Sequence, residues 1–99
     1  MEIFARKDVI IIGGGTAGLA AAISAAKNGV TTLIIEQQGF LGGTMTSCLL
    51  PHMQTFHDIS SNQIIKGVAQ EIIDELIIKK GAIGHLQRPP KFWGTDTPY

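Results

Sequence analysis

The stretch that decides the fold is DVIIIGGGTAGLAAAISAAKNGVTTLIIE, residues 8–36. A run of β-branched residues at 9–12 is followed by three glycines, and small helix-forming residues extend from Thr16 to about Asn28. A short, continuous apolar run is typical of a strand buried on both faces in a parallel sheet. Asn28 and Gly29 form a helix stop, and a second β-branched run follows at 31–35. This order predicts one βαβ unit with a right-handed crossover.

The glycines have the spacing G-x-G-x-x-G at residues 13–18, directly after the first strand and at the start of the helix. In this motif Gly13 permits the tight turn, Gly15 lets a pyrophosphate approach the backbone, and Gly18 lets the helix pack closely on the sheet. The first N–H groups of a helix have no internal acceptor, and the helix dipole is positive there. The motif therefore predicts an anion site made of backbone.

One carboxylate, Glu36, ends the second strand. A carboxylate at this place can accept hydrogen bonds from an adenosine ribose, and it would repel a 2′-phosphate. The alternative is a solvated charge at a strand end. Together with the glycine motif, Glu36 favours a dinucleotide ligand and disfavours NADP.

Three segments resemble the FAD-dependent oxidoreductases, whose N-terminal Rossmann-like domain opens with such a glycine motif. They are DVIIIGGGTAGLAAA at 8–22, GFLGGTMTSCLLP at 39–51 and IIKGVAQEIIDELIIKKGA at 64–82. The resemblance covers about residues 8–83 and is specific for the flavoprotein class, not for a substrate. It implies an α/β fold, namely a partial Rossmann-like βαβ unit with parallel strands plus an additional amphipathic helix.

The same resemblance implies that the cofactor is FAD and assigns residues to its parts. The residues expected at the pyrophosphate are Gly13, Gly15, Thr16, Ala17 and Gly18. Glu36 and Gln37 are expected at the adenosine, and Gly43 and Thr44 further along the cofactor. The substrate and the catalytic residues are not indicated by any of these positions.

A neighbouring family, the pyridine nucleotide-disulfide reductases, carries two cysteines after Leu-Gly-Gly-Thr, five positions apart. Here Met45 and Leu50 stand at those places, and only Cys48 lies between them. Because a dithiol that cycles through a disulfide needs two thiols, this segment is not expected to perform that chemistry. Cys48 is expected to be a small packed residue.

Beyond Glu36, residues 37–61 read as a long loop with one short helical turn. An apolar stripe with helical spacing begins near Gln63 and predicts an amphipathic helix that covers one face of a sheet. Ser60, Ser61 or Asn62 is expected to cap the start of this helix, and Gly81 is expected to end it. A third strand is expected near Ala82. His52 and His57 lie in the loop, and the sequence places no carboxylate or thiol at metal-ligand spacing from them, so no metal site is expected. A position beside the flavin is the alternative for either histidine.

The composition limits the partners and the location. Eight acidic and eight basic residues give a net charge of zero, and without a Lys/Arg cluster nucleic-acid binding is not expected. The apolar run at 9–26 is interrupted by glycines, so no membrane span is expected. A single cysteine fits a reducing compartment, and we expect a cytoplasmic location.

The length is short for this function, because a doubly wound dinucleotide fold has two βαβαβ halves. We therefore expect residues 1–99 to be the N-terminal part of an FAD-binding domain within a longer oxidoreductase, and the 99-residue chain alone to be inactive. The alternative is a stand-alone nucleotide-binding or interaction module that a partner chain completes.

Overall fold

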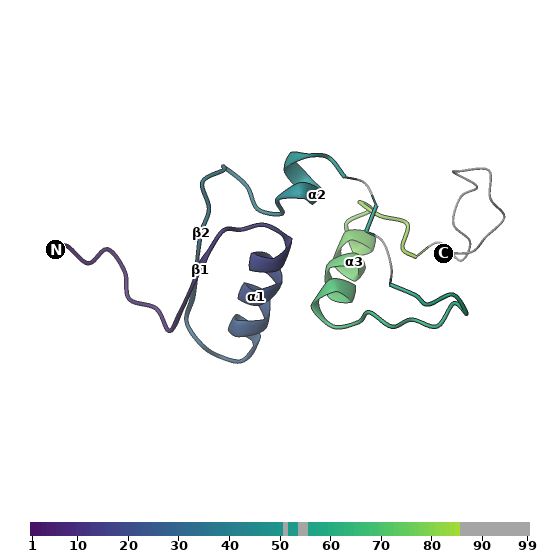
Figure 1. The fold of residues 1–99 in the computed structure, drawn as a ribbon, viewed down its shortest axis with the longest axis horizontal. Helices are drawn as coiled ribbons and strands as arrows, with labels where there is room; N and C mark the ends of the chain where they lie inside the picture. Colours follow the sequence, from purple (N-terminus) through teal and green to yellow (C-terminus); the bar gives the residue numbers. More distant parts are fainter. Residues whose placement is uncertain (51, 54–55, 86–99) are drawn as a thin grey trace. The chain divides into compact units, whose positions relative to one another are not determined.

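A computed structural model describes residues 1–50, 52–53 and 56–85 of the chain. The chain forms two compact units, Met1–His52 and Met53–Tyr99. The first unit contains β1 (Val9–Ile12), α1 (Thr16–Lys27), β2 (Thr32–Ile35) and the short α2 (Thr44–Ser47), and the second contains α3 (Val68–Ile78), as Figure 1 shows. The expected α/β class, with parallel strands and a separate helix, is confirmed.

The first unit is a single βαβ unit. β1 and β2 pair in parallel from Val9 opposite Thr32 to Ile12 opposite Ile35. Exposure alternates along β1, where Ile10 and Ile12 are exposed and the residues between and before them are half-buried. A Cβ on Gly18 of α1 would lie 3.3 Å from Ile11 Cγ2, so Ile11 faces the helix. α1 thus covers one face of the two-stranded sheet, and the other face is exposed in the described residues.

Asp8 and Thr31, the residues directly before β1 and β2, bind each other, and we call this pair the Asp8–Thr31 clamp. The Asp8 N–H donates to Thr31 Oγ1 at 3.0 Å, while the Thr31 N–H and hydroxyl donate to Asp8 Oδ2 at 2.8 and 2.7 Å. The Thr31 hydroxyl, followed by the Thr31 N–H, lowers the pKa of Asp8. The clamp fixes the start of the strand pair.

The predicted end of α1 and the short helical turn in the following loop are both confirmed. Asn28 is the C-cap of α1, and its Nδ2 donates to the Ser24 carbonyl at 2.8 Å. Gly29 follows with a φ of +84°, the left-handed conformation that glycine adopts readily. α2 is the expected helical turn.

In the second unit, the prediction that the helix begins near Gln63 was wrong. α3 begins at Val68, after Gly67 with φ 71° and ψ −140°. The N–H groups of Ile64 and Ile65 both donate to the Phe56 carbonyl, at 2.8 and 3.1 Å, which draws these residues out of the helix.

The residues predicted to cap α3, Ser60, Ser61 and Asn62, form a different local structure. The N–H groups of Ser60 and Asn62 donate to Asp58 Oδ1 at 2.9 and 2.8 Å, and the Ser61 N–H donates to the Asp58 carbonyl at 3.0 Å. These three residues therefore form a turn around Asp58 instead of capping α3. The sequence also predicted a third strand near Ala82. No residue from Ala82 to His85 is in a strand, and the residues after His85 lie outside the described part of the chain.

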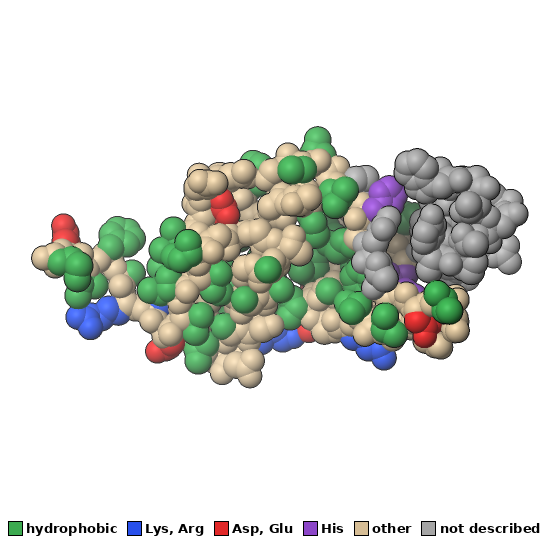
Figure 2. Space-filling view, viewed as in Figure 1, with side chains coloured by type: hydrophobic (Ala, Val, Ile, Leu, Met, Phe, Trp, Pro, Cys, Tyr) green, Lys and Arg blue, Asp and Glu red, His purple; other side chains and the backbone are tan. Residues whose placement is uncertain are grey.

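Little apolar surface is buried in the described part of the chain. The buried apolar side chains there are Ala22 in α1, Phe56, and Ile73 in α3. Many large apolar side chains are exposed, and Figure 2 shows them on the visible surface of the first unit. None of the helices in the described ranges has the length and apolar character to cross a membrane.

Candidate functional site

The turn from β1 into α1 is fixed by Gly13. Its φ is +97°, a conformation that side chains other than glycine rarely adopt. The Gly13 N–H donates to the carbonyl of Ile35 at 2.8 Å. The first residue of the glycine-rich loop is therefore bound to the end of β2.

Gly14 is buried, and both of its backbone polar groups have partners within the unit. Its N–H donates to Glu36 Oε2 at 2.6 Å, and its carbonyl accepts the Gly42 N–H at 2.9 Å. A Cβ at this position would overlap Leu41 Cδ2. Neither of these roles was predicted from the sequence, although Gly14 is the middle glycine of the run at 13–15 and Gly42 belongs to the second glycine pair.

The remaining two glycines of the motif differ from each other. A Cβ on Gly18 would overlap the Gly13 carbonyl oxygen, so close packing of helix and loop requires glycine there. Gly15 has an ordinary φ of −71°, and a Cβ added to it would meet no protein atom within 4 Å. Neither backbone conformation nor packing within the described residues explains the glycine at position 15.

The N-terminus of α1 begins at this loop. Its first hydrogen bond runs from the Leu19 N–H to the Gly15 carbonyl at 2.8 Å, so the N–H groups of Thr16, Ala17 and Gly18 precede the hydrogen-bond ladder of the helix. Gly15 supplies no side-chain cap, and the first turn has no acidic residue. Thr16 and Ala17 are exposed. These N–H groups and the helix dipole are suited to an anion.

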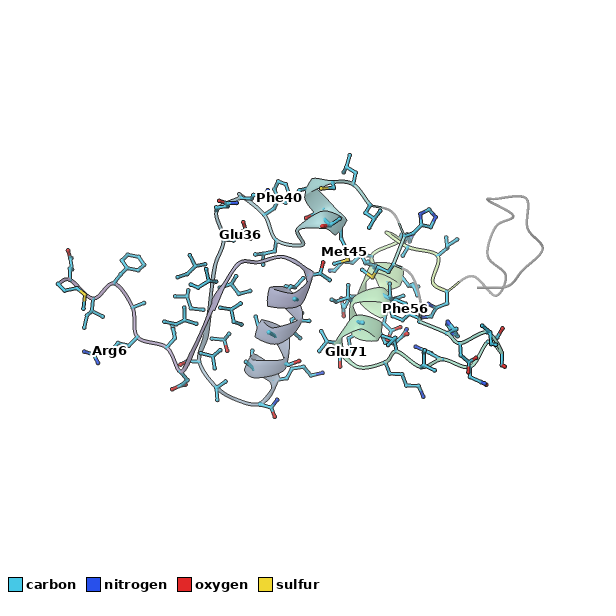
Figure 3. All side chains as sticks on the ribbon, viewed as in Figure 1. Arg6, Glu36, Phe40, Met45, Phe56 and Glu71 are labelled. Atoms are coloured by element: carbon cyan, nitrogen blue, oxygen red, sulfur yellow. The ribbon has the colours of Figure 1, made fainter. Side chains whose placement is uncertain are left out.

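Glu36 stands directly after β2, close to the same loop (Figure 3). Its Oε1 accepts the Gln38 N–H at 2.9 Å and its Oε2 accepts the Gly14 N–H. The N–H groups of Gln38 and Gly14, with a smaller contribution from Gln37, lower the pKa of Glu36. The carboxyl is therefore ionised at neutral pH, as an ordinary glutamate is. Gln37 itself is exposed beside it.

The second glycine pair lies against the first loop. Gly43 is the N-cap of α2 with a φ of 54°, and a Cβ on it would lie 2.9 Å from Gly15 Cα. Thr44, the first residue of α2, is exposed. The structure thus brings together the predicted residues of the glycine-rich loop, Glu36 and Gly43, with Gln37 and Thr44 next to them in the chain.

Cys48 belongs to the first unit, as the glycine-rich loop does, and His57 belongs to the second. Cys48 is exposed at the end of α2, so the prediction of a packed side chain was wrong, because the one-turn helix leaves its C-cap uncovered. His57 belongs to the second unit, where its ring lies 5.0 Å from that of His85 between centroids. Among the described residues, no three or more His, Cys, Asp or Glu side chains form a group that could hold a metal ion.

Parts of several known proteins are similar to this chain. The dihydrolipoyl dehydrogenase of Trypanosoma brucei brucei is 39% identical over 67 residues, which cover 61% of this chain and 14% of that protein. The thiamine thiazole synthase of Aeropyrum pernix is 37% identical over 79 residues, which cover 79% of the chain and 26% of that protein. The chain therefore spans only a small part of the length of these relatives. No solved structure gives a significant match.

The family described as "FAD dependent oxidoreductase" matches residues 8–97, which is most of the chain and includes both glycine segments, Glu36 and α3. FAD, the cofactor in the description of this family, is a dinucleotide, which is the class of ligand that the glycine motif and Glu36 predict. On this match, the chain belongs to the FAD-dependent oxidoreductase family.

Proposed function

We propose that this chain is the N-terminal part of an FAD-binding domain and that it holds the ADP half of FAD in an oxidoreductase. The pyrophosphate lies at the N-terminus of α1, against the loop and first turn formed by Gly13, Gly15, Thr16, Ala17 and Gly18. Glu36 and Gln37 bind the adenosine, and Gly43 and Thr44 lie further along the cofactor. When bound, FAD supplies the redox chemistry through its isoalloxazine ring.

The observation that carries this proposal is the open space at Gly15. Gly13 needs its left-handed φ, and Gly18 needs its closeness to the Gly13 carbonyl, but Gly15 has neither constraint. A glycine whose Cβ position is empty, at the uncapped start of a helix, fits a ligand that approaches the backbone directly.

The charges of the site fit the two parts of the ligand. The N-terminal N–H groups of α1 stabilise the negative pyrophosphate. The ionised Glu36 has acceptor capacity beyond its two backbone hydrogen bonds, because a carboxylate offers about four lone-pair sites. Ribose hydroxyls can donate to the remaining sites. Dithiol chemistry is not part of the proposal, because Met45 and Leu50 replace the two cysteines it would need.

We expect the full-length wild-type protein to purify yellow, with the absorption bands of oxidised flavin. The substitution Gly15→Ala in that protein tests the proposal. The alanine Cβ would occupy the space of the pyrophosphate, so the FAD dissociation constant should rise at least about tenfold. The measurement is titration of the flavin-free protein with FAD, followed by flavin fluorescence.

The matched control is Gly39→Ala in the loop after β2. A Cβ on Gly39 also meets nothing within 4 Å, and its φ is not left-handed. This variant should bind FAD as the wild type does, and both variants should unfold at the wild-type temperature. Equal FAD affinity of Gly15→Ala and wild type would refute the assignment, as would a colourless full-length protein that binds NAD.

A further inference from the structure

We propose that Glu36 is a positioning residue: its carboxylate holds the amide of Gly14 and thereby shapes the glycine-rich loop before the nucleotide binds. This role is separate from the ribose contact and rests on the proposed function, since the loop it shapes is the one assigned to the pyrophosphate. The effect of Glu36 on affinity therefore has two parts, of which only one requires the ribose hydroxyls.

The two carboxylate oxygens bind different segments of the chain. Oε1 accepts the N–H of Gln38, two residues further on, which fixes the side chain relative to its own backbone. Oε2 accepts the N–H of Gly14, which is 22 positions away in the sequence and belongs to the β1–α1 loop. Glu36 therefore connects the end of β2 to the loop through a short, charge-assisted hydrogen bond.

Gly14 transmits this connection to the second glycine pair. Its carbonyl accepts the Gly42 N–H, and the adjacent Gly43 lies close enough to Gly15 that a Cβ would be 2.9 Å from the Gly15 Cα. The residue that Glu36 holds is thus the one on which the Gly42–Gly43 segment rests. Gly15 and the first turn of α1 stay open to the ligand.

Loss of the carboxylate would leave the buried Gly14 N–H without an acceptor, which is unfavourable enough to move the loop towards water. Binding would then have to order the loop again, which reduces affinity for any nucleotide. In Glu36→Gln the amide offers one acceptor oxygen and one NH₂ group, so one of the two backbone N–H groups would face a donor. This substitution keeps the size of the side chain but removes the charge, so the side chain can no longer hold both segments with charge-assisted hydrogen bonds.

The test compares ADP with 2′,3′-dideoxy-ADP, which lacks both ribose hydroxyls, in the flavin-free full-length protein. We expect Glu36→Gln to bind dideoxy-ADP at least about fivefold more weakly than the wild type, because the loop is no longer held. The control is Glu75→Gln on α3, which should bind both nucleotides as the wild type does. If Glu36→Gln and wild type bind dideoxy-ADP equally, Glu36 acts only through the ribose and the inference is overturned.

A second measurement needs no ligand. The Gly14 amide should be protected from hydrogen exchange in the flavin-free wild type and should exchange at least about tenfold faster in Glu36→Gln, but not in Glu75→Gln. An unprotected Gly14 amide in the wild type overturns the inference even if the variant does not fold. A wild type that binds neither nucleotide refutes the proposed function, and the exchange measurement still decides whether Glu36 holds the Gly14 amide.

Discussion

Two carboxylates, Asp8 and Glu36, accept backbone N–H groups at opposite ends of the β1–β2 pair. Asp8 binds Thr31 where the strands begin, and Glu36 binds Gly14 where they end. The pKa of each carboxyl is lowered by these hydrogen bonds, so both groups are ionised when they hold the backbone. A slip of one strand along the other would break both sets of contacts, and the register is therefore specified at each end by a charged side chain.

The Asp8–Thr31 clamp predicts an acid-dependent stability. The Thr31 hydroxyl and N–H hold the folded pKa of Asp8 below its unfolded value of about 3.9. A carboxyl shifted in this direction contributes stability above the unfolded pKa, and the contribution is lost as pH falls through the folded pKa. Asp8→Asn should therefore have a lower urea midpoint than the wild type at about pH 7, and the difference should shrink below about pH 3.9.

The control for this prediction is Glu2→Gln, an exposed carboxyl in the segment before the clamp. It should leave the urea midpoint unchanged at either pH. A difference between Asp8→Asn and wild type that stays constant or grows on acidification would show that Asp8 does not act through its ionised carboxylate.

At the scale of elements, α3 shows how local backbone geometry overrides a sequence pattern. The apolar stripe continues back to Ile64, yet the helix starts only after Gly67, whose φ of 71° and ψ of −140° lie close to a region that is essentially restricted to glycine. The residues before it bond to the Phe56 carbonyl instead. Gly67 therefore separates the helix from the preceding segment.

Substitution of Gly67 should destabilise the second unit through backbone strain alone. A Cβ there meets nothing within 4 Å, so Gly67→Ala should reduce the free energy of unfolding by about 1–3 kcal/mol without a steric clash. Gly81→Ala, beyond the other end of α3, is the matched control, because its Cβ would make an ordinary contact at 3.4 Å from Leu76 Cδ2. It should change the stability by less than about 0.5 kcal/mol. Equal urea midpoints for the two variants would contradict the strain argument.

The sequence predicted those elements whose signals are local. The β-branched runs, the glycine spacing and the Asn28–Gly29 stop lie within one βαβ unit, and the strands and α1 match their predicted bounds to within one residue. The Glu36–Gly14 bond and the hydrogen bonds to Phe56 join residues through a side chain or a distant carbonyl, and no periodicity encodes them. For the same reason the roles of Gly14 and Gly42 became apparent only from the structure.

At the scale of the whole molecule, the described residues form a site without a substantial core around it. Ile10, Ile12 and Ile35 are exposed on the strands, and few apolar side chains are buried elsewhere. A chain of this size buries a smaller share of its surface than a full domain does. The geometry of the site therefore depends on hydrogen bonds within the βαβ unit more than on apolar packing.

For the isolated 99-residue chain we predict weak FAD binding. Exposed apolar surface should make it aggregate or pack loosely, and ordering of the loop after Glu36 would reduce the binding free energy. Titration with FAD, followed by flavin fluorescence, should give no saturable sub-micromolar isotherm, whereas the flavin-free full-length protein should give one under the same conditions. A one-to-one, sub-micromolar isotherm for the isolated chain would contradict this prediction.

The contacts of the Asp8 and Glu36 carboxylates involve residues that are synthesised early. The Asp8–Thr31 clamp and the bonds of Glu36 to Gly14 and Gln38 all lie between residues 8 and 38. Ribosomal synthesis delivers the N-terminal residues first, so every group in these contacts leaves the ribosome before the residues that follow Gln38. The contacts that set the register of β1 against β2 and hold Gly14 therefore need no residue beyond Gln38, and every group in them is available while translation continues.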